Sequence, residues 1–391
     1  MLPVEEKDKK SYIVLWILTI TIITFGIGGL LVFSYFYNNQ TYSHYQVVSE
    51  VERSDSNNVT YQYFQKNLLK YSGNGISLID SKGKTLWNGG FDMKMVQVDT
   101  CVDQVLAADI GGNSFHIYDG KSEGAEMETT YPIVRAKVSA GGLAAVLEQD
   151  TESNSLKVYN PAGTTAKLLV EIPTNVSEEG YPLDFDISPD GKTLVAAYMV
   201  VEGTEAKCRV NFYNFTEVGQ DKNMLVGGKD YGDEMVSSIR FLDNDRVIIY
   251  REKGFDVYEH MLEPHPVLEK SFDQTIVSVA DNADDESSGD DYIAVVTAND
   301  TMTSRQLQVF TPEGEVVLDT PVNYDYSEFK IYGSEFYFYG SHHADVMRLN
   351  GTTKFETDFD LELDGFFPGG RSTDYLVVDY NYIRKIRMKS K

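Results

Sequence analysis

The chain has 391 residues, of which 60 are Asp or Glu and 34 are Lys or Arg, so its formal net charge is −26. A surface this acidic repels phosphate backbones, which excludes a nucleic-acid partner; it is either a coat that keeps the protein soluble or a surface for cations and basic partners. Two cysteines, Cys101 and Cys208, are too few for a disulfide-stabilised scaffold, so the core has to hold the fold.

The first predicted element is a membrane helix. Residues 13–36 carry no charge, and as a helix of about 36 Å they would cross a hydrocarbon layer of about 30 Å. Lys7, Lys9 and Lys10 precede this stretch, and the first Lys or Arg after it is Arg53. The positive-inside rule then predicts a cytoplasmic tail over 1–11, an uncleaved transmembrane signal anchor over 12–37 and a plasma-membrane protein whose remaining chain lies outside the cell. A cleaved signal peptide is the alternative.

A polar stalk is expected over residues 38–58, followed by one large domain over residues 59–391. Within this domain a short pattern recurs, in which a strand ends on an apolar or aromatic residue and a polar turn follows. Residues 76–87 form the first copy, a strand, a turn with Gly83 and a second strand. The strand-ending positions of the copies are 80, 119, 160, 214, 259, 311 and 350, and an eighth copy lies at 382–387. A period near 40 to 50 residues with several strands per unit is typical of a β-propeller.

Each copy follows a nearly continuous apolar run, such as 194–200 or 292–297, as expected for strands buried between neighbouring blades. Further strands precede these runs, so each unit has four. The last copy stops without an outer strand, and we expect a strand at 46–52 or 59–64 to complete its blade. The predicted fold is therefore an all-β propeller of eight blades, with seven as the alternative, preceded by one transmembrane helix.

Two motifs carry a resemblance to known propellers. Residues 185–195, with Ser188-Pro189-Asp190-Gly191-Lys192 at their centre, are similar to turns of WD40-like and TolB-like repeats, and residues 80–87 are similar to quinoprotein-like strand ends. The chain also resembles an uncharacterised family of membrane-anchored β-propellers from Gram-positive anaerobic bacteria, through residues 68–72, 75–77 and 131–133. The resemblance implies the fold. Because that family has no assigned activity, it carries no functional residue to this chain.

Two clusters contain metal-ligand residue types. The acidic loop 281–291 offers oxygen ligands for Ca²⁺, although Glu286 stands where an EF-hand needs Gly, and a solvated loop is the alternative. Its candidate ligands are Asp281, Asp284, Asp285, Asp290 and Asp291. In His342-His343-Ala344-Asp345 the two adjacent histidines would point to opposite faces of a strand, so we do not expect them to share a metal.

We find no catalytic constellation, and Ca²⁺ is the only cofactor that the sequence suggests. The sequence favours a binding or scaffold module at the bacterial cell envelope, which contacts the membrane through 12–37 and binds an envelope protein, a peptide or a wall glycan. The alternative is a surface glycan-active hydrolase or lyase with carboxylates at the mouth of the propeller channel. A third hypothesis is a sensor that works through other membrane proteins.

Overall fold

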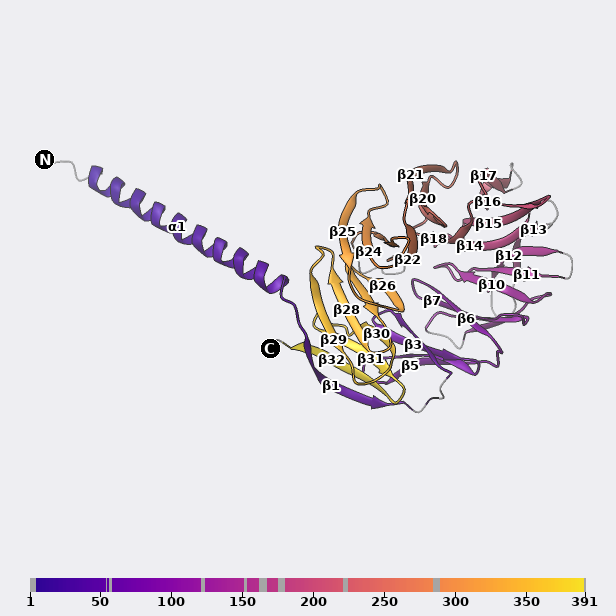
Figure 1. The fold of residues 1–391 in the computed structure, drawn as a ribbon, viewed down its shortest axis with the longest axis horizontal. Coiled ribbons are helices and arrows are strands. Elements are labelled where there is room, and N and C mark those ends of the chain that lie inside the picture. The colour runs from indigo at the N-terminus through magenta and orange to yellow at the C-terminus, as the bar shows by residue number, and fades with distance from the viewer. Residues whose placement is uncertain are drawn as a thin grey trace.

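The computed structural model describes residues 5–53, 55, 58–120, 124–150, 153–161, 167–174, 180–220, 224–283 and 289–389. Over these residues a long helix, α1 (Glu5–Asn38), projects from a ring of eight four-stranded antiparallel sheets, so the predicted all-β propeller with eight blades is confirmed (Figure 1). One short helix, α2 (Glu217–Gln220), lies between two strands of the fourth blade.

The strands of the first four blades follow the chain in order. Blade 1 consists of β2 (Thr60–Phe64), β3 (Asn67–Ser72), β4 (Gly75–Ile79) and β5 (Thr85–Gly90), and blade 2 of β6 (Val96–Cys101), β7 (Gln104–Asp109), β8 (Ser114–Tyr118) and β9 (Ala125–Glu128). Blade 3 consists of β10 (Ile133–Val138), β11 (Ala144–Gln149), β12 (Asn154–Asn160) and β13 (Lys167–Thr174), and blade 4 of β14 (Tyr181–Ile187), β15 (Thr193–Glu202), β16 (Glu205–Asn214) and β17 (Leu225–Gly232).

The next three blades repeat this order, and the eighth combines the two ends of the ring. Blade 5 consists of β18 (Val236–Phe241), β19 (Val247–Arg251), β20 (Gly254–Glu259) and β21 (His265–Ser271), and blade 6 of β22 (Thr275–Asp281), β23 (Ile293–Ala298), β24 (Arg305–Phe310) and β25 (Val316–Val322). Blade 7 consists of β26 (Glu328–Tyr332), β27 (Glu335–Tyr339), β28 (His343–Arg348) and β29 (Thr353–Asp358), and blade 8 of β30 (Leu363–Pro368), β31 (Asp374–Asp379), β32 (Tyr382–Lys389) and β1 (His44–Glu52).

The core lies between the blades. Successive side chains of a strand point to opposite faces, and the second strand of blade 7 shows the result. Phe336 and Phe338 pack against residues of blade 6, while Tyr337 and Tyr339 pack against residues of blade 8. This explains why the second strand of each blade reads as an almost unbroken apolar run.

The hairpin at residues 76–87 has the predicted form. Its strands are β4 and β5, the two outer strands of blade 1, and Gly83 makes the turn with a φ of +77°. Trp87 stacks on Tyr118 of blade 2, with ring centroids 5.5 Å apart. Trp87 is therefore a packing residue between two blades.

An N-terminal strand closes the ring. Strand β1 pairs antiparallel with β32 from His44–Lys389 to Glu52–Tyr382, and Arg384 Nε donates to Glu50 Oε2 at 2.5 Å. The closing strand is thus the predicted 46–52 segment, whereas 59–64 matches β2, the innermost strand of blade 1. Part of the segment expected as a stalk belongs to the propeller.

The predicted membrane anchor requires a correction. Among the residues that the structure describes, no helix is both long enough and apolar enough to cross a membrane. The transmembrane segment at 12–37, and with it the single-pass plasma-membrane location with a cytoplasmic N-terminus, was therefore predicted wrongly.

Candidate functional site

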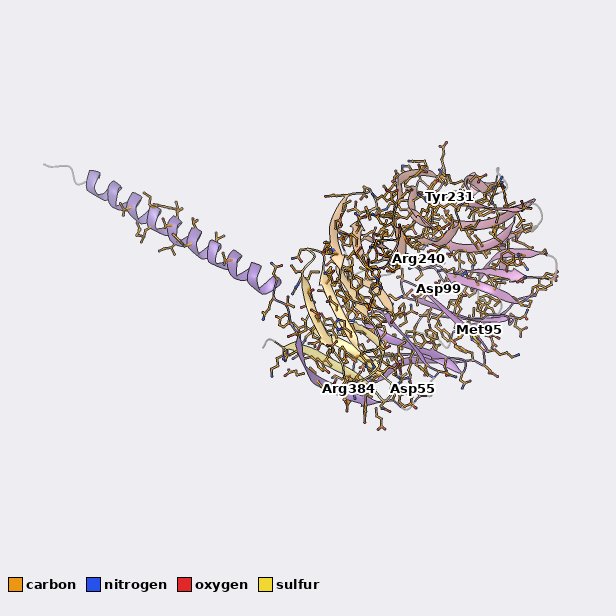
Figure 2. All side chains as sticks on the ribbon, viewed as in Figure 1. Asp55, Met95, Asp99, Tyr231, Arg240 and Arg384 are labelled. Carbon is orange, nitrogen blue, oxygen red and sulfur yellow. The ribbon has the colours of Figure 1, made fainter. Side chains whose placement is uncertain are left out.

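A cavity of about 220 Å³ opens where four innermost strands end. Its wall is formed by the C-terminal residues of β6, β10, β14 and β18 and by the turns that follow them. The first strands of neighbouring blades lie against one another, so this wall is one mouth of the central channel. Figure 2 shows Asp99 and Arg240, which both line the cavity, near the middle of the ring.

Carboxylates at this mouth bind the next blade. An innermost strand has one edge without a partner strand, and its N–H groups need acceptors. Asp99 Oδ2 accepts from the backbone N–H of Val138, and Asp186 Oδ2 accepts from that of Phe241, each at 2.8 Å. Two residues earlier in β14, Asp184 Oδ2 accepts from the N–H of Ile239 at 2.8 Å. These bonds join blade 2 to blade 3 and blade 4 to blade 5.

Lys137 lies between two of these carboxylates. Its Nζ is 3.1 Å from Asp99 Oδ1 and 3.9 Å from Asp186 Oδ1. Burial lowers the pKa of Lys137, but the attraction of Asp99 and Asp186 outweighs it and raises the pKa overall. Lys137 therefore stays charged and ties three blades together.

Whereas burial lowers the pKa of Lys137, it raises the pKa of Asp186. Loss of water raises the pKa of its carboxyl to about 6, although Lys137 and Arg240 act to lower it. Arg240 also lines the cavity, with its Nε 3.8 Å from Asp281 Oδ1 and its side chain 24 % exposed. The mouth thus combines a carboxyl that titrates near neutral pH with a guanidinium that solvent can reach.

The residues predicted for Ca²⁺ have separate surroundings. Asp281 ends β22 and accepts from the Tyr250 hydroxyl at 3.0 Å, and Asp291 accepts from Arg246 at 2.8 Å. Asp290 interacts through its backbone oxygen with the Asn282 amide at 2.9 Å. Asp284 and Asp285 lie outside the described residues, so Ca²⁺ binding by this loop stays a prediction.

Sequence reasoning missed Asp99, Lys137, Asp186 and Arg240. For Lys137 and Asp186 a signal exists, because charged residues recur at every second position of their two innermost strands. Arg135 and Lys137 do so in β10, and Asp184 and Asp186 in β14. This spacing places each pair on one face of its strand, but it does not say which neighbour that face meets.

Solved structures support the architecture. The crystal structure of BamB from Moraxella catarrhalis is 9 % identical, with a TM-score of 0.52, and the match covers 88 % of this chain and 100 % of that chain. The crystal structure of the eukaryotic initiation factor is 12 % identical, with a TM-score of 0.50, and the match covers 88 % of this chain and 87 % of that chain. At these identities the similarity shows a shared propeller fold alone.

The comparison with curated proteins gave no match in sequence. A family model described as "Family of unknown function (DUF5711)" matches residues 38–388, from just before the closing strand β1 almost to the end of β32. The expected kinship with an uncharacterised propeller family is thereby confirmed, and the chain belongs to the family of unknown function DUF5711.

Proposed function

We propose that this propeller is a binding or scaffold module that holds a segment of a protein or peptide partner at the mouth formed by β6, β10, β14 and β18. The cavity at that mouth is the observation that carries the proposal. Its wall combines apolar side chains, such as Val102 and Ile187, with the charged groups of Asp99, Asp186 and Arg240. An apolar wall with a few convergent polar groups is the usual composition of a binding site.

The size of the cavity favours a side chain of a larger partner. Sites for free small ligands usually measure about 300–1,000 Å³, whereas this cavity holds about 220 Å³. A single side chain of a bound segment would fill it, and an acidic one would meet the guanidinium of Arg240. This fit makes a protein or peptide a better candidate than a wall glycan, which needs an extended groove.

The alternative of a glycan hydrolase or lyase would use carboxylates at the same mouth. Asp99 and Asp186 are there, and the raised pKa of Asp186 is a property of general acids. Each of these carboxylates, however, already accepts a backbone N–H, and Lys137 lies within 4 Å of both. We therefore assign them first to holding the blades together and forming the wall of the site.

The proposal can be tested with a photo-crosslinking amino acid at Val102, which is 40 % exposed beside the cavity, and at Leu169, which is 45 % exposed on the outer strand of blade 3. In cells that produce the protein, we expect a discrete crosslinked species from position 102 but not from position 169. Arg240→Met should weaken this product at least about fivefold, because the guanidinium is then absent from the site. Equal crosslinking from both positions, or a product unchanged by Arg240→Met in a variant that melts like the parent, would exclude this mouth as the binding site.

A further inference from the structure

Four side chains of metal-ligand type lie on one face of blade 7, a blade that does not line the channel cavity. Strands β28 and β29 pair so that His343 is opposite Asp358 and Asp345 is opposite Glu356. His343 and Asp345 are two residues apart, so their side chains share a face, and their cross-strand partners share it too. Donor atoms of His343, Asp345 and Glu356 all lie within 4.8 Å of one another.

The histidine of this group is oriented by a carboxylate. The Nδ1 of His343 is 2.8 Å from Asp358 Oδ1, and because a carboxylate only accepts, Nδ1 carries the hydrogen. The Nε2 of the neutral ring then has a free lone pair. This Nε2 is buried and has no hydrogen-bond partner among the described residues. A histidine held by a carboxylate with its other nitrogen open is the usual arrangement of a metal ligand.

The two carboxylates of this group, a buried one on Asp345 and an exposed one on Glu356, lie side by side. Asp345 is 1 % exposed, and its Oδ1 has no hydrogen-bond partner. Glu356 lies directly across the ladder from it, and like charges opposite each other destabilise a strand pair. No Lys or Arg of the described residues forms an ion pair with either carboxylate. Buried charges in proteins are as a rule paired or bound to a metal.

We propose that His343, Asp345 and Glu356 bind a first-row divalent metal ion, with Asp358 positioning the histidine. One nitrogen and two carboxylate oxygens suit Zn²⁺ and its neighbours, whereas Ca²⁺ and Mg²⁺ prefer oxygen ligands alone. A dication balances the two carboxylates. The site lies outside the acidic loop and away from the channel cavity, and it does not depend on the function proposed above.

Binding requires a small contraction of the site. With metal–ligand distances of about 2.1 Å in a tetrahedral arrangement, the donors stand about 3.4 Å apart, so the side chains must move together by about an ångström. The ring of Tyr324 packs 6.3 Å from that of His343 and 5.3 Å from that of Phe338, between centroids. Because Tyr324 belongs to the connection from blade 6 to blade 7, a bound ion would stabilise both β28–β29 and the joint between these blades.

The test uses the full chain, stripped of metal with a chelator and then titrated with ZnCl₂ by calorimetry and thermal unfolding. We expect one Zn²⁺ per chain and a higher Tm in excess Zn²⁺. His343→Gln and Asp345→Asn should each weaken binding at least tenfold, and Asp358→Asn, which removes the positioning carboxylate, about tenfold. Without metal, Asp345→Asn should melt at or above the parent because one of two facing charges is gone; with Zn²⁺ it should melt below the parent.

Two matched controls separate this site from its neighbours. His342 is the adjacent histidine, and its ring contacts the backbone oxygen of Leu361 instead; His342→Gln should bind Zn²⁺ like the parent. His260 belongs to a more exposed group with Glu259 and His265, and His260→Gln should also leave the affinity unchanged. Zn²⁺ affinity that survives both His343→Gln and Asp345→Asn, or that is lost in His260→Gln, would overturn the proposal, as would an effect of Asp345→Asn that is the same with and without Zn²⁺.

Discussion

Burial makes the carboxyl of Asp186 costly to ionise, because the carboxylate loses its contact with water. Its Oδ2 accepts the N–H of Phe241, and its Oδ1 is 3.9 Å from the ammonium of Lys137. Arg240 also attracts it, while Asp99 repels it. The balance leaves its pKa at about 6, well above that of a carboxyl in an unfolded chain. The folded protein therefore holds a proton on Asp186 at a pH where the unfolded chain has released it.

This difference makes the stability depend on pH in a definite direction. The contribution of Asp186 is fully present below the pKa of the unfolded chain, near 4, and is lost as the pH rises through about 6. Relative to Asp186→Asn, the parent should thus lose up to about 3 kcal/mol of unfolding free energy between pH 4 and pH 7. Thermal unfolding of both proteins over this range measures it. The exposed substitution Asp300→Asn serves as the control, and a parent–variant difference in Tm that is flat with pH would contradict the assignment.

Residue roles were the hardest to predict from the sequence. Asp186 lies in the stretch that resembles WD40-like turns, and that resemblance concerns the turn after it, where Ser188 Oγ donates to Asp190 at 2.8 Å and Gly191 has a φ of +71°. What Asp186 binds is decided by blade 5, which no local pattern identifies. For His343 and Asp345 the spacing of two predicts a shared face, but the cross-strand register that brings Glu356 beside them is a property of the pairing.

Among the strands, those of blade 5 are joined by one buried guanidinium. Arg251 ends β19, and its side chain is only 7 % exposed. It donates to Asp256 Oδ1 of β20 and to both oxygens of Glu234, each at 2.8 Å, and to the backbone oxygen of Lys270 in β21 at 3.0 Å. The Tyr231 hydroxyl donates to the other oxygen of Asp256 at 2.7 Å. The arginine thereby connects β19, β20 and β21 with Glu234, which lies just before β18.

Replacing this arginine should be among the costliest changes in the propeller. In Arg251→Met the carboxyl of Asp256, which is 1 % exposed, loses the cation that pairs with it. We expect a loss of about 3–5 kcal/mol in unfolding free energy, measured by denaturant unfolding. The double variant Arg251→Met/Asp256→Asn should recover a good part of it because the stranded charge is gone. If the double variant is no more stable than the single one, packing and not charge explains the effect.

Strand positions were predictable to the extent that both faces of a strand are buried. The apolar runs at 194–200 and 292–297 lie within or around β15 and β23, and the aromatic strand ends match the third strands of the blades. Outer strands are half exposed and more polar, as β13 shows. For this reason β1, which is also an outer strand, was assigned partly to a stalk although its 46–52 core was one of two candidates for closing the ring.

At the scale of the molecule, the ring depends on the pairing of β1 with β32. Figure 1 shows β1, the first element after α1, beside the C-terminal strands. The turn of the first hairpin also rests on it, because a Cβ at Gly83 would come within 2.7 Å of Val51. Strand β1 therefore supports blade 8 by hydrogen bonds and blade 1 by packing.

A chain that begins at Arg53 should consequently lose ring stability, whereas one that begins at Asn39 should keep it. Without β1, the edge of β32 is open and available to other chains, so we expect a Tm lower by several degrees and larger species in gel filtration. A synthetic peptide of residues 41–53 should reverse both effects by occupying the vacant edge. Equal Tm values for the two truncated proteins would show that closure contributes little to stability.

The same closure has a consequence for how the protein is made. His44 emerges from the ribosome long before its pairing partner Lys389, which lies 345 positions later in the chain. Blades 1 to 7 are each formed from one continuous stretch and can fold in turn, but the eighth has to wait until β32 has been synthesised. Until then β1 is an unpaired strand tethered to a growing arc, and it is during this interval that two nascent chains can exchange their first strands.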